Sequence, residues 1–230
     1  MSIKGFLFDF DGTLFFNSEF HLIATGRVFE KYYGVPAPDE QTMTNKIFGR
    51  TNKTIVLEHI DPNADEEKIK FFDTTKEQEY RNLCLEHKDE LHLVDGSVEL
   101  LDYLKANDIK RCIATCAPIS NVNFYREQFG IDEWFGDGRL LYFDGSFPGK
   151  PAPDIYIMAA KRLGLDPSEC VVFEDGTSGI IAAHEAGCGG IVAVYDERFD
   201  LPDSAKAMVD SIHHDFNDWR SILAGYGFKF

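Results

Sequence analysis

The sequence predicts an α/β protein in which a parallel β-sheet carries helices on both faces. After residue 110, short apolar segments bounded by turn residues alternate with helical patterns of about ten residues. Strands and helices that alternate in this way form βαβ units, whose strands run parallel. A further apolar segment opens the chain, and the residues between it and about residue 92 show helical patterns only. We therefore expect an all-helical insert after the first strand.

The first strand is predicted over 5–8, where the residues are apolar apart from one glycine. It is followed by Asp9, Asp11 and Gly12. Residues i and i+2 of a strand point to the same side, and the carboxyl end of a parallel strand is where ligands bind in α/β sheets. Two carboxylates this close repel each other unless one is protonated or both share a cation. The alternative is a polar turn that closes the strand.

The helical insert begins with apolar residues at three- and four-residue steps, among them Phe20, Ala24 and Val28, and glycine and proline then end this helix. The expected helices of the insert are 17–33, 39–48, 51–59 and 65–88, the last of which could be one long helix or two. The expected elements after the insert are helices at 97–107, 120–129, 153–163, 178–186 and 219–223, and strands at 111–114, 139–142, 170–173, 190–195 and around 212.

Composition excludes several classes of function. The chain has 230 residues and a formal charge of −16, which disfavours binding to nucleic acid but permits a small anionic substrate beside a metal ion. A membrane-spanning helix needs about 18 or more consecutive apolar residues, and no apolar run in the chain approaches that length. The N-terminus does not resemble a signal peptide. The five cysteines have no zinc-like spacing. We expect free thiols in a cytoplasmic protein that has no membrane partner.

Three later segments place reactive side chains where predicted strands end or helices begin. Thr115 ends one strand, Lys150 precedes a helix in a proline-rich loop, and Glu174 and Asp175 end another strand. Each has an ordinary alternative: a helix cap, a solvated lysine or a turn. A hydroxyl and free backbone N–H groups at a helix start, here at Cys116 and Ala117, can also hold a phosphate. These features together indicate one site at the carboxyl edge of the sheet.

These segments resemble the four motifs of the haloacid dehalogenase superfamily. They are D-F-D-G-T-L from Asp9, the threonine after a strand, G-K-P-A-P-D from Gly149 and F-E-D-G-T-S-G-I from Phe173. The subfamily with the best match contains β-phosphoglucomutase and sugar phosphatases. The resemblance implies a Rossmann-like core formed by 1–15 and 93–230. It also implies a small helical cap domain formed by 16–92.

The resemblance also implies roles for the motif residues. Asp9 would be the nucleophile that forms an aspartyl-phosphate, and Asp11 the general acid and base. Thr115 and Lys150 would hold the transferring phosphoryl oxygens. The cofactor would be Mg²⁺, bound by Asp9, by the backbone carbonyl of Asp11 and by Asp175. Glu174 would be a further ligand or would support the ligands from behind.

The cap would choose the substrate. His21 falls where mutase-like members carry a histidine near the general acid. The segment with Gly49, Arg50 and Thr51 resembles the substrate loop of the cap, and Lys76 matches a lysine that meets the sugar phosphate. The alternatives are a surface histidine and a solvated lysine.

Two departures from the mutase pattern favour a phosphatase. Asn52 stands where the cap loop of a mutase has arginine, and the residues after Thr115 are Cys116, Ala117 and Pro118 instead of a lysine-bearing segment. We therefore expect hydrolysis of a small phosphorylated metabolite, a sugar phosphate, by a monomer or weak homodimer. The alternatives are a phosphomutase of the same fold and an inactive scaffold that binds a partner. We also consider that Cys116, next to the phosphate-site threonine, makes the enzyme sensitive to oxidation.

Overall fold

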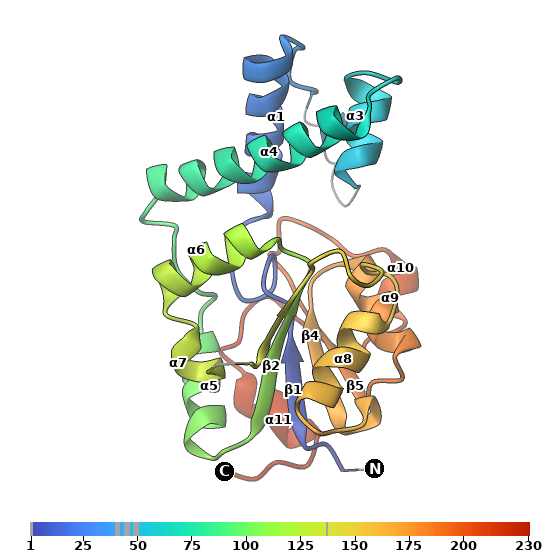
Figure 1. Ribbon diagram of the computed structural model, residues 1–230. Helices are drawn as coiled ribbons and strands as arrows, with labels where there is room; N and C mark the ends of the chain where they lie inside the picture. Colours follow the sequence, from blue (N-terminus) through green and yellow to red (C-terminus); the bar gives the residue numbers. More distant parts are fainter. Residues whose placement is uncertain (1, 40–41, 44–46, 48–50, 137) are drawn as a thin grey trace. The chain divides into compact units, whose positions relative to one another are not determined.

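The computed structural model describes residues 2–39, 42–43, 47, 51–136 and 138–230. The chain forms two compact units, Met1–Phe16 with His92–Phe230, and Asn17–Leu91. We call them the α/β unit and the helical unit. Figure 1 labels most of their elements.

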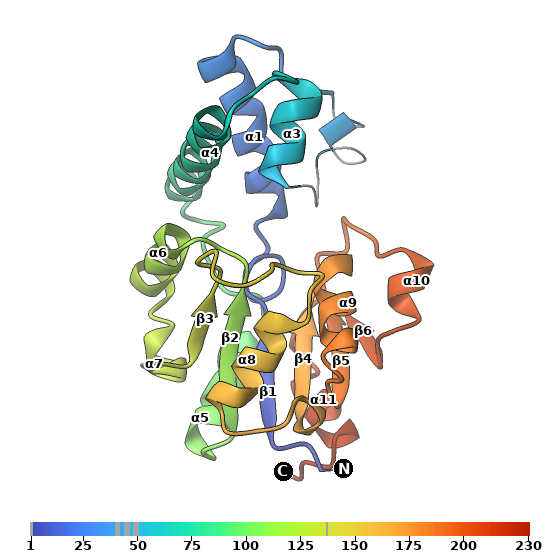
Figure 2. The same ribbon diagram turned by 45° about the vertical axis from the view of Figure 1, so that its right-hand side comes forward.

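The α/β unit contains a six-stranded sheet in the order β3-β2-β1-β4-β5-β6, and each neighbouring pair is parallel. This strand order is that of a Rossmann-like, doubly wound sheet, so the predicted fold class is confirmed. Figure 2 shows β1 between β2 and β4. The strands are β1 (Gly5–Phe8), β2 (Lys110–Thr115), β3 (Leu140–Tyr142), β4 (Cys170–Glu174), β5 (Gly190–Val194) and β6 (Ser211–His213).

Each long predicted helix after the insert is present within one or two residues at either end. Among the described residues, the structure adds two short α-helices, α7 and α10, and a 3₁₀ helix at Pro167–Glu169, which the sequence pattern did not reveal. The helices of this unit are α5 (Ser97–Ala106), α6 (Ile119–Phe129), α7 (Asp132–Phe135), α8 (Asp154–Arg162), α9 (Thr177–Glu185), α10 (Asp203–Lys206) and α11 (Trp219–Gly225).

The two faces of the sheet are packed differently. On one face, Leu7 and Val172 belong to an aliphatic core that also contains buried residues of α8 and α9. Alternation along the strands puts Phe8 and Phe173 on the opposite face, where their rings stack 4.8 Å apart. All four residues of β1 are buried, as expected for a central parallel strand. Packing on both faces therefore fixes the end of β1, where the candidate site begins.

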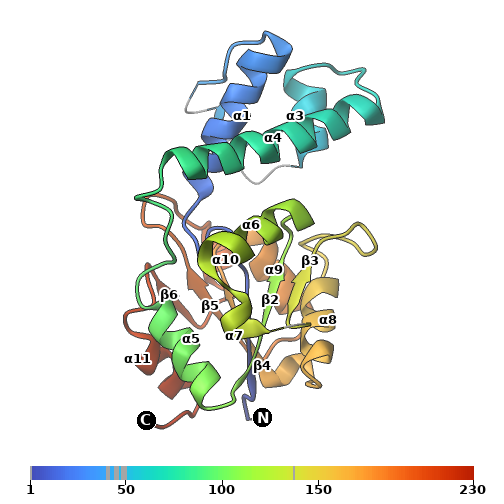
Figure 3. The ribbon, with the colours of Figure 1, turned by 60° about the vertical axis from the view of Figure 1, so that its left-hand side comes forward.

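The helical unit contains α1 (Ser18–Tyr33), α3 (Asn52–His59) and α4 (Glu66–Glu86). Figure 3 shows α1 and α3 beside the long α4. Phe29 and Phe72 meet edge to face in its core, 6.2 Å apart. Three of the predicted helices are thus present, while the one expected over 39–48 falls largely outside the described residues. None of the helices described is long and apolar enough to cross a membrane.

Candidate active site

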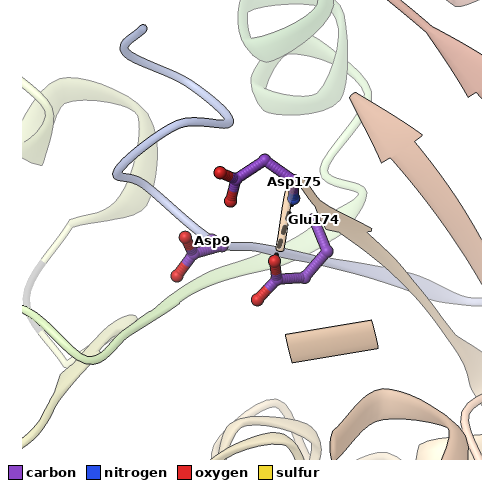
Figure 4. Close-up of side chains that lie close together, drawn as sticks. All are labelled: Asp9, Glu174 and Asp175. Carbon is purple, nitrogen blue, oxygen red and sulfur yellow. Dashed lines mark hydrogen bonds between the residues drawn. The ribbon is translucent and has the colours of Figure 1, made fainter. Parts of the chain in front are cut away.

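The carboxyl ends of β1 and β4 bring three acids together. Ligand oxygens of Asp9, Glu174 and Asp175 all lie within 4.8 Å of one another, although Asp9 is far from the other two in the sequence. Figure 4 shows the three side chains converging from the two strand ends. The parallel pairing of Phe8 with Phe173 sets this register, because it places Asp9, which follows β1, beside Glu174, the last residue of β4. The acids predicted to meet therefore do so.

Lys150 supplies a positive charge within this acid cluster. Its Nζ lies 2.7 Å from Asp9 Oδ1 and 2.6 Å from Glu174 Oε1, and its side chain is 7% exposed. It also lies 5.0 Å from the centre of the Tyr156 ring. Burial lowers the pKa of Lys150, but Asp9 and Glu174 more than offset this, so the net pKa lies well above its ordinary value. This shift favours the charged form of Lys150.

One lysine does not balance three acids, of which Asp9 and Glu174 are buried and Asp175 is half-buried. Burial raises the pKa of Asp9 to about 7 against the opposing effect of Lys150, and Glu174 and Asp11 raise it further. Burial, followed by the charges of Glu174 and Asp9, also raises the pKa of Asp175 well above its ordinary value. Hard oxygen donors with an excess of negative charge are the ligand set that Mg²⁺ prefers. The residues present therefore fit a divalent cation.

The Glu174 carboxylate is held in place by four hydrogen bonds. Its Oε1 accepts hydrogen bonds from Lys150 and from the Tyr156 hydroxyl, at 2.6 and 2.9 Å. Its Oε2 accepts from the backbone N–H groups of Asp175 and Gly176, both at 2.9 Å. These four bonds make Glu174 the residue that orients Lys150 and the turn after β4. Tyr156, which the sequence analysis missed, lies two residues after the G-K-P-A-P-D motif, in the first turn of α8.

Glycine at position 12 allows the turn after β1 to approach Asp175. Its φ is +80°, which favours glycine, and a Cβ there would lie 2.0 Å from Asp175 Oδ2. The next residue, Thr13, donates a hydrogen bond to Asp175 Oδ1 over 3.3 Å. The D-G-T part of the first motif therefore contacts the last motif through Gly12 and Thr13. Because Thr13 belongs to the first motif, the sequence could have predicted its place in the site.

Asp11 and Thr115 lie next to each other at the ends of β1 and β2. The Thr115 hydroxyl donates to Asp11 Oδ2 over 3.4 Å and accepts from the Ala117 N–H at 3.0 Å. The Tyr125 hydroxyl donates to the other oxygen, Asp11 Oδ1. Sequence reasoning missed Tyr125, because no motif contains it. The Ala117 N–H, predicted to meet a phosphate, bonds here to Thr115.

Cys116 is exposed as a residue, yet it lies beside the buried charges of the site. Desolvation raises the pKa of its thiol, against the opposing charge of Lys150. The thiolate is the form that oxidants attack, so this shift disfavours the oxidation-sensitive role considered above.

The other residues predicted to bind the substrate all fall within the range of the helical unit. The His21 ring stacks on Tyr80 with centroids 3.9 Å apart, and Lys76 pairs with Glu77 at 2.7 Å. Thr51 caps α3 by accepting a hydrogen bond from the Thr54 N–H. Gly49 and Arg50 lie outside the described residues.

Comparison with known proteins establishes the family. The model of the haloacid dehalogenase-like hydrolases matches residues 3–187, so the chain belongs to this family of hydrolases. The resemblance and the enzyme class predicted from the motifs are thereby confirmed.

Relatives in this family include named phosphatases. The chain is 31% identical to a probable pseudouridine-5'-phosphatase of Drosophila melanogaster, over 87% of this chain and 85% of that one. It is 28% identical to a phosphorylated carbohydrates phosphatase of Thermotoga maritima, over 91% of each chain. A β-phosphoglucomutase from Clostridium difficile shares the fold, with a TM-score of 0.77, 23% identity and 97% of each chain covered.

Proposed function

We propose that this hydrolase is a Mg²⁺-dependent phosphatase that releases phosphate from a small phosphomonoester through an aspartyl-phosphate. The observation that carries the proposal is the convergence of Asp9, Glu174 and Asp175 around Lys150 at the carboxyl edge of the sheet. A nucleophilic carboxylate needs neighbouring positive charge to approach a phosphate dianion, and this site combines a lysine with a ligand set for a cation.

In the proposed mechanism, the Asp9 carboxylate attacks phosphorus and the P–O bond to the substrate alcohol breaks. Asp11 gives its proton to the departing alcohol oxygen. It then takes a proton from the water that attacks the phosphorus of the aspartyl-phosphate, which releases inorganic phosphate and restores Asp9. General acid and base catalysis of this kind contributes roughly 10²–10⁴-fold to a rate.

Lys150 and Thr115 would contact the phosphoryl oxygens as negative charge develops on them. The Thr115 hydroxyl, which donates to Asp11 in the structure, can rotate toward a bound phosphate. Asp9, Asp175 and the Asp11 backbone carbonyl would hold the Mg²⁺, with Glu174 as a ligand or as the support of Lys150. The bound ion would neutralise the acids and polarise the phosphoryl group.

The substrate class we propose is a sugar phosphate. Two relatives are named for substrates that carry a phosphate on a sugar, a pseudouridine phosphate and phosphorylated carbohydrates. The helical unit would act as the cap that selects among such substrates, through His21, Lys76 and the segment of Gly49, Arg50 and Thr51. The net charge of −16 supports a small metabolite in preference to nucleic acid. Cytoplasmic location and a monomer or weak homodimer remain part of the proposal.

A phosphomutase is the second candidate, because a β-phosphoglucomutase shares the fold. A single assay separates the two. Purified protein with Mg²⁺ is mixed with a panel of sugar phosphates, and both free phosphate and isomerised sugar phosphate are measured, with and without a trace of sugar bisphosphate. Free phosphate supports the phosphatase. Bisphosphate-dependent isomerisation without phosphate release would show a mutase, and inactivity on every phosphate ester would refute both.

A further inference from the structure

Tyr125 lies in α6 and is 1% exposed, yet its polar end reaches the candidate site. Its hydroxyl donates a hydrogen bond to Asp11 Oδ1. Its ring stacks on Phe10, the residue between the two aspartates of the first motif, with centroids 4.2 Å apart and planes 19° from parallel. A tyrosine has only two side-chain torsions, so this stacking also fixes the direction of its hydroxyl.

The two oxygens of Asp11 therefore have different surroundings. Oδ1 accepts from a buried phenol held by ring stacking, whereas Oδ2 accepts from the Thr115 hydroxyl over a longer distance of 3.4 Å. The hydrogen bond from Thr115 to Oδ2 can break when substrate binds, since this hydroxyl is a candidate phosphate ligand. The Tyr125 hydroxyl is not among the proposed phosphate ligands.

We propose that Tyr125 is a positioning residue for Asp11, which holds Oδ1 so that Oδ2 is the oxygen that gives the proton to the departing alcohol. The inference rests on the proposed function of Asp11. A carboxyl group that accepts the phenol hydrogen at Oδ1 carries its own proton on Oδ2. That proton moves to the bridging oxygen as the P–O bond breaks, while Tyr125 keeps its proton and its bond to Oδ1.

This arrangement makes a specific demand on the leaving group. A sugar alkoxide is strongly basic and needs the proton from Asp11, so misplacing that carboxyl slows its departure. A p-nitrophenolate leaves readily without a proton. Loss of the Tyr125 hydroxyl should therefore slow the first substrate much more than the second. Loss of folded protein would slow both equally.

The test compares Tyr125→Phe with the wild type on a sugar phosphate that the wild type hydrolyses and on p-nitrophenyl phosphate. The quantity measured is kcat/KM, which reports the steps up to loss of the leaving group. We expect a fall of about 10- to 100-fold for the sugar phosphate, the size typical of a misplaced catalytic group, and less than about three-fold for p-nitrophenyl phosphate. The ratio of the two values cancels any change in the fraction of active protein.

Tyr103→Phe is the matched control, because this tyrosine packs against Trp219, belongs to α5 and takes no part in the site. It should leave both values unchanged. Equal falls for the two substrates with Tyr125→Phe, or no fall for either, would overturn the role of Tyr125 while the proposed function stands. A wild type that hydrolyses neither substrate would refute the proposed function itself.

Discussion

Gly179, in α9, makes room for Glu174 at the end of the neighbouring strand. A Cβ at this position would lie 1.6 Å from Glu174 Oε1, the oxygen that accepts from Lys150 and Tyr156. The last motif therefore needs its second glycine for space, because Glu174 turns back under the first turn of the helix. The position of Lys150 depends on that same space.

We predict that Gly179→Ala lowers activity and stability. Alanine in a helix normally stabilises it by up to about 1 kcal/mol relative to glycine. Here the methyl group must displace Glu174, so we expect a loss of about 1–3 kcal/mol in the free energy of unfolding and at least a ~10-fold fall in phosphate release. Urea unfolding and a phosphate assay measure the two effects.

The control for this substitution is Gly225→Ala, at the end of α11, where nothing lies within 4 Å of the added methyl group. It should be neutral or slightly stabilising with full activity. Equal behaviour of the two variants would show that the space beside Glu174 has no functional importance.

Single residues also show how far the sequence could predict the site. Asp9 and Asp175 stand in motifs that follow the neighbouring strands β1 and β4, and parallel pairing is enough to bring these strand ends together. Lys150 stands in a motif too, in the loop before α8. Tyr125 stands in no motif. Its contact with Asp11 depends on the tertiary placement of α6 and on ring stacking, neither of which leaves a periodic signal in the sequence.

At the scale of elements, α1 and α4 of the helical unit are joined by an ion pair around a buried acid. Glu79 of α4 is 4% exposed, and its Oε1 accepts from Lys31 Nζ at 2.7 Å and from the Tyr32 hydroxyl at 2.9 Å. These two hydrogen bonds hold the pKa of Glu79 below its ordinary value, and the bond from Lys31 has the larger effect. The pair thus adds a polar connection to the apolar packing of this unit.

We predict that Lys31→Met destabilises the protein at neutral pH and not at strongly acidic pH. Because the folded-state pKa of Glu79 is lowered, the folded state binds fewer protons there than the unfolded state. The stabilisation is present above the unfolded-state pKa, near 4.5, and is lost as the pH falls through the folded-state value. Melting temperatures of the variant and the wild type, measured from pH 7 down to pH 3, should therefore converge.

Lys53→Met is the control, since it removes an exposed lysine from α3 of the same unit. Its melting temperature should follow that of the wild type at every pH. A difference for Lys31→Met that persists unchanged at pH 3 would contradict the role of Glu79.

The elements themselves were predicted best where the pattern was long. The strands β1 and β5 are apolar runs, and β2 and β4 contain such runs at 112–114 and 170–173. The helices α1 and α4 have apolar periodicity. The short helix α7 was missed because four residues span barely one helical turn and show no periodicity. Its Phe135 packs against Phe8 of β1, so tertiary contact defines it.

At the scale of the whole molecule, excess negative charge is concentrated inside the α/β unit as well as spread over the surface. The chain carries a formal charge of −16, and three of its acids meet around one lysine. Folding without a cation therefore places carboxylates where they are partly desolvated and repel each other. A bound divalent ion would remove this cost, which links metal binding to the stability of the fold.

We predict that Mg²⁺ raises the melting temperature more at pH 8 than at pH 5. The folded-state pKa of Asp9, about 7, lies above the ordinary value of 3.8, so without a cation its contribution to stability declines as the pH rises between these values. At pH 5 bound protons compete with the metal, whereas at pH 8 the carboxylates are free to bind it. Thermal melts with Mg²⁺ and with a chelator measure the effect.

Asp175→Asn removes one proposed ligand, and its melting temperature should respond little to Mg²⁺ at either pH. A Mg²⁺ response in this variant as large as that of the wild type would place the metal elsewhere. The chelator should also abolish phosphate release by the wild type, and added Mg²⁺ should restore it.

The parallel sheet and the helical insert could both be predicted from the sequence, since alternation of elements determines topology in this fold class. The substrate could not, because the residues proposed to select it carry weak signals when taken singly, such as Lys76, which pairs with Glu77. Motif residues are fixed by shared chemistry, and substrate residues vary with the substrate.

The most direct test of the account is phosphate release by Asp9→Asn, measured with Mg²⁺ on the best substrate of the wild type. Asparagine keeps the size of the side chain but cannot form the phosphoryl bond of the intermediate. The account predicts a folded protein whose kcat is lower by about 10⁴-fold or more. A folded Asp9→Asn protein that retains a tenth or more of the wild-type kcat would contradict it.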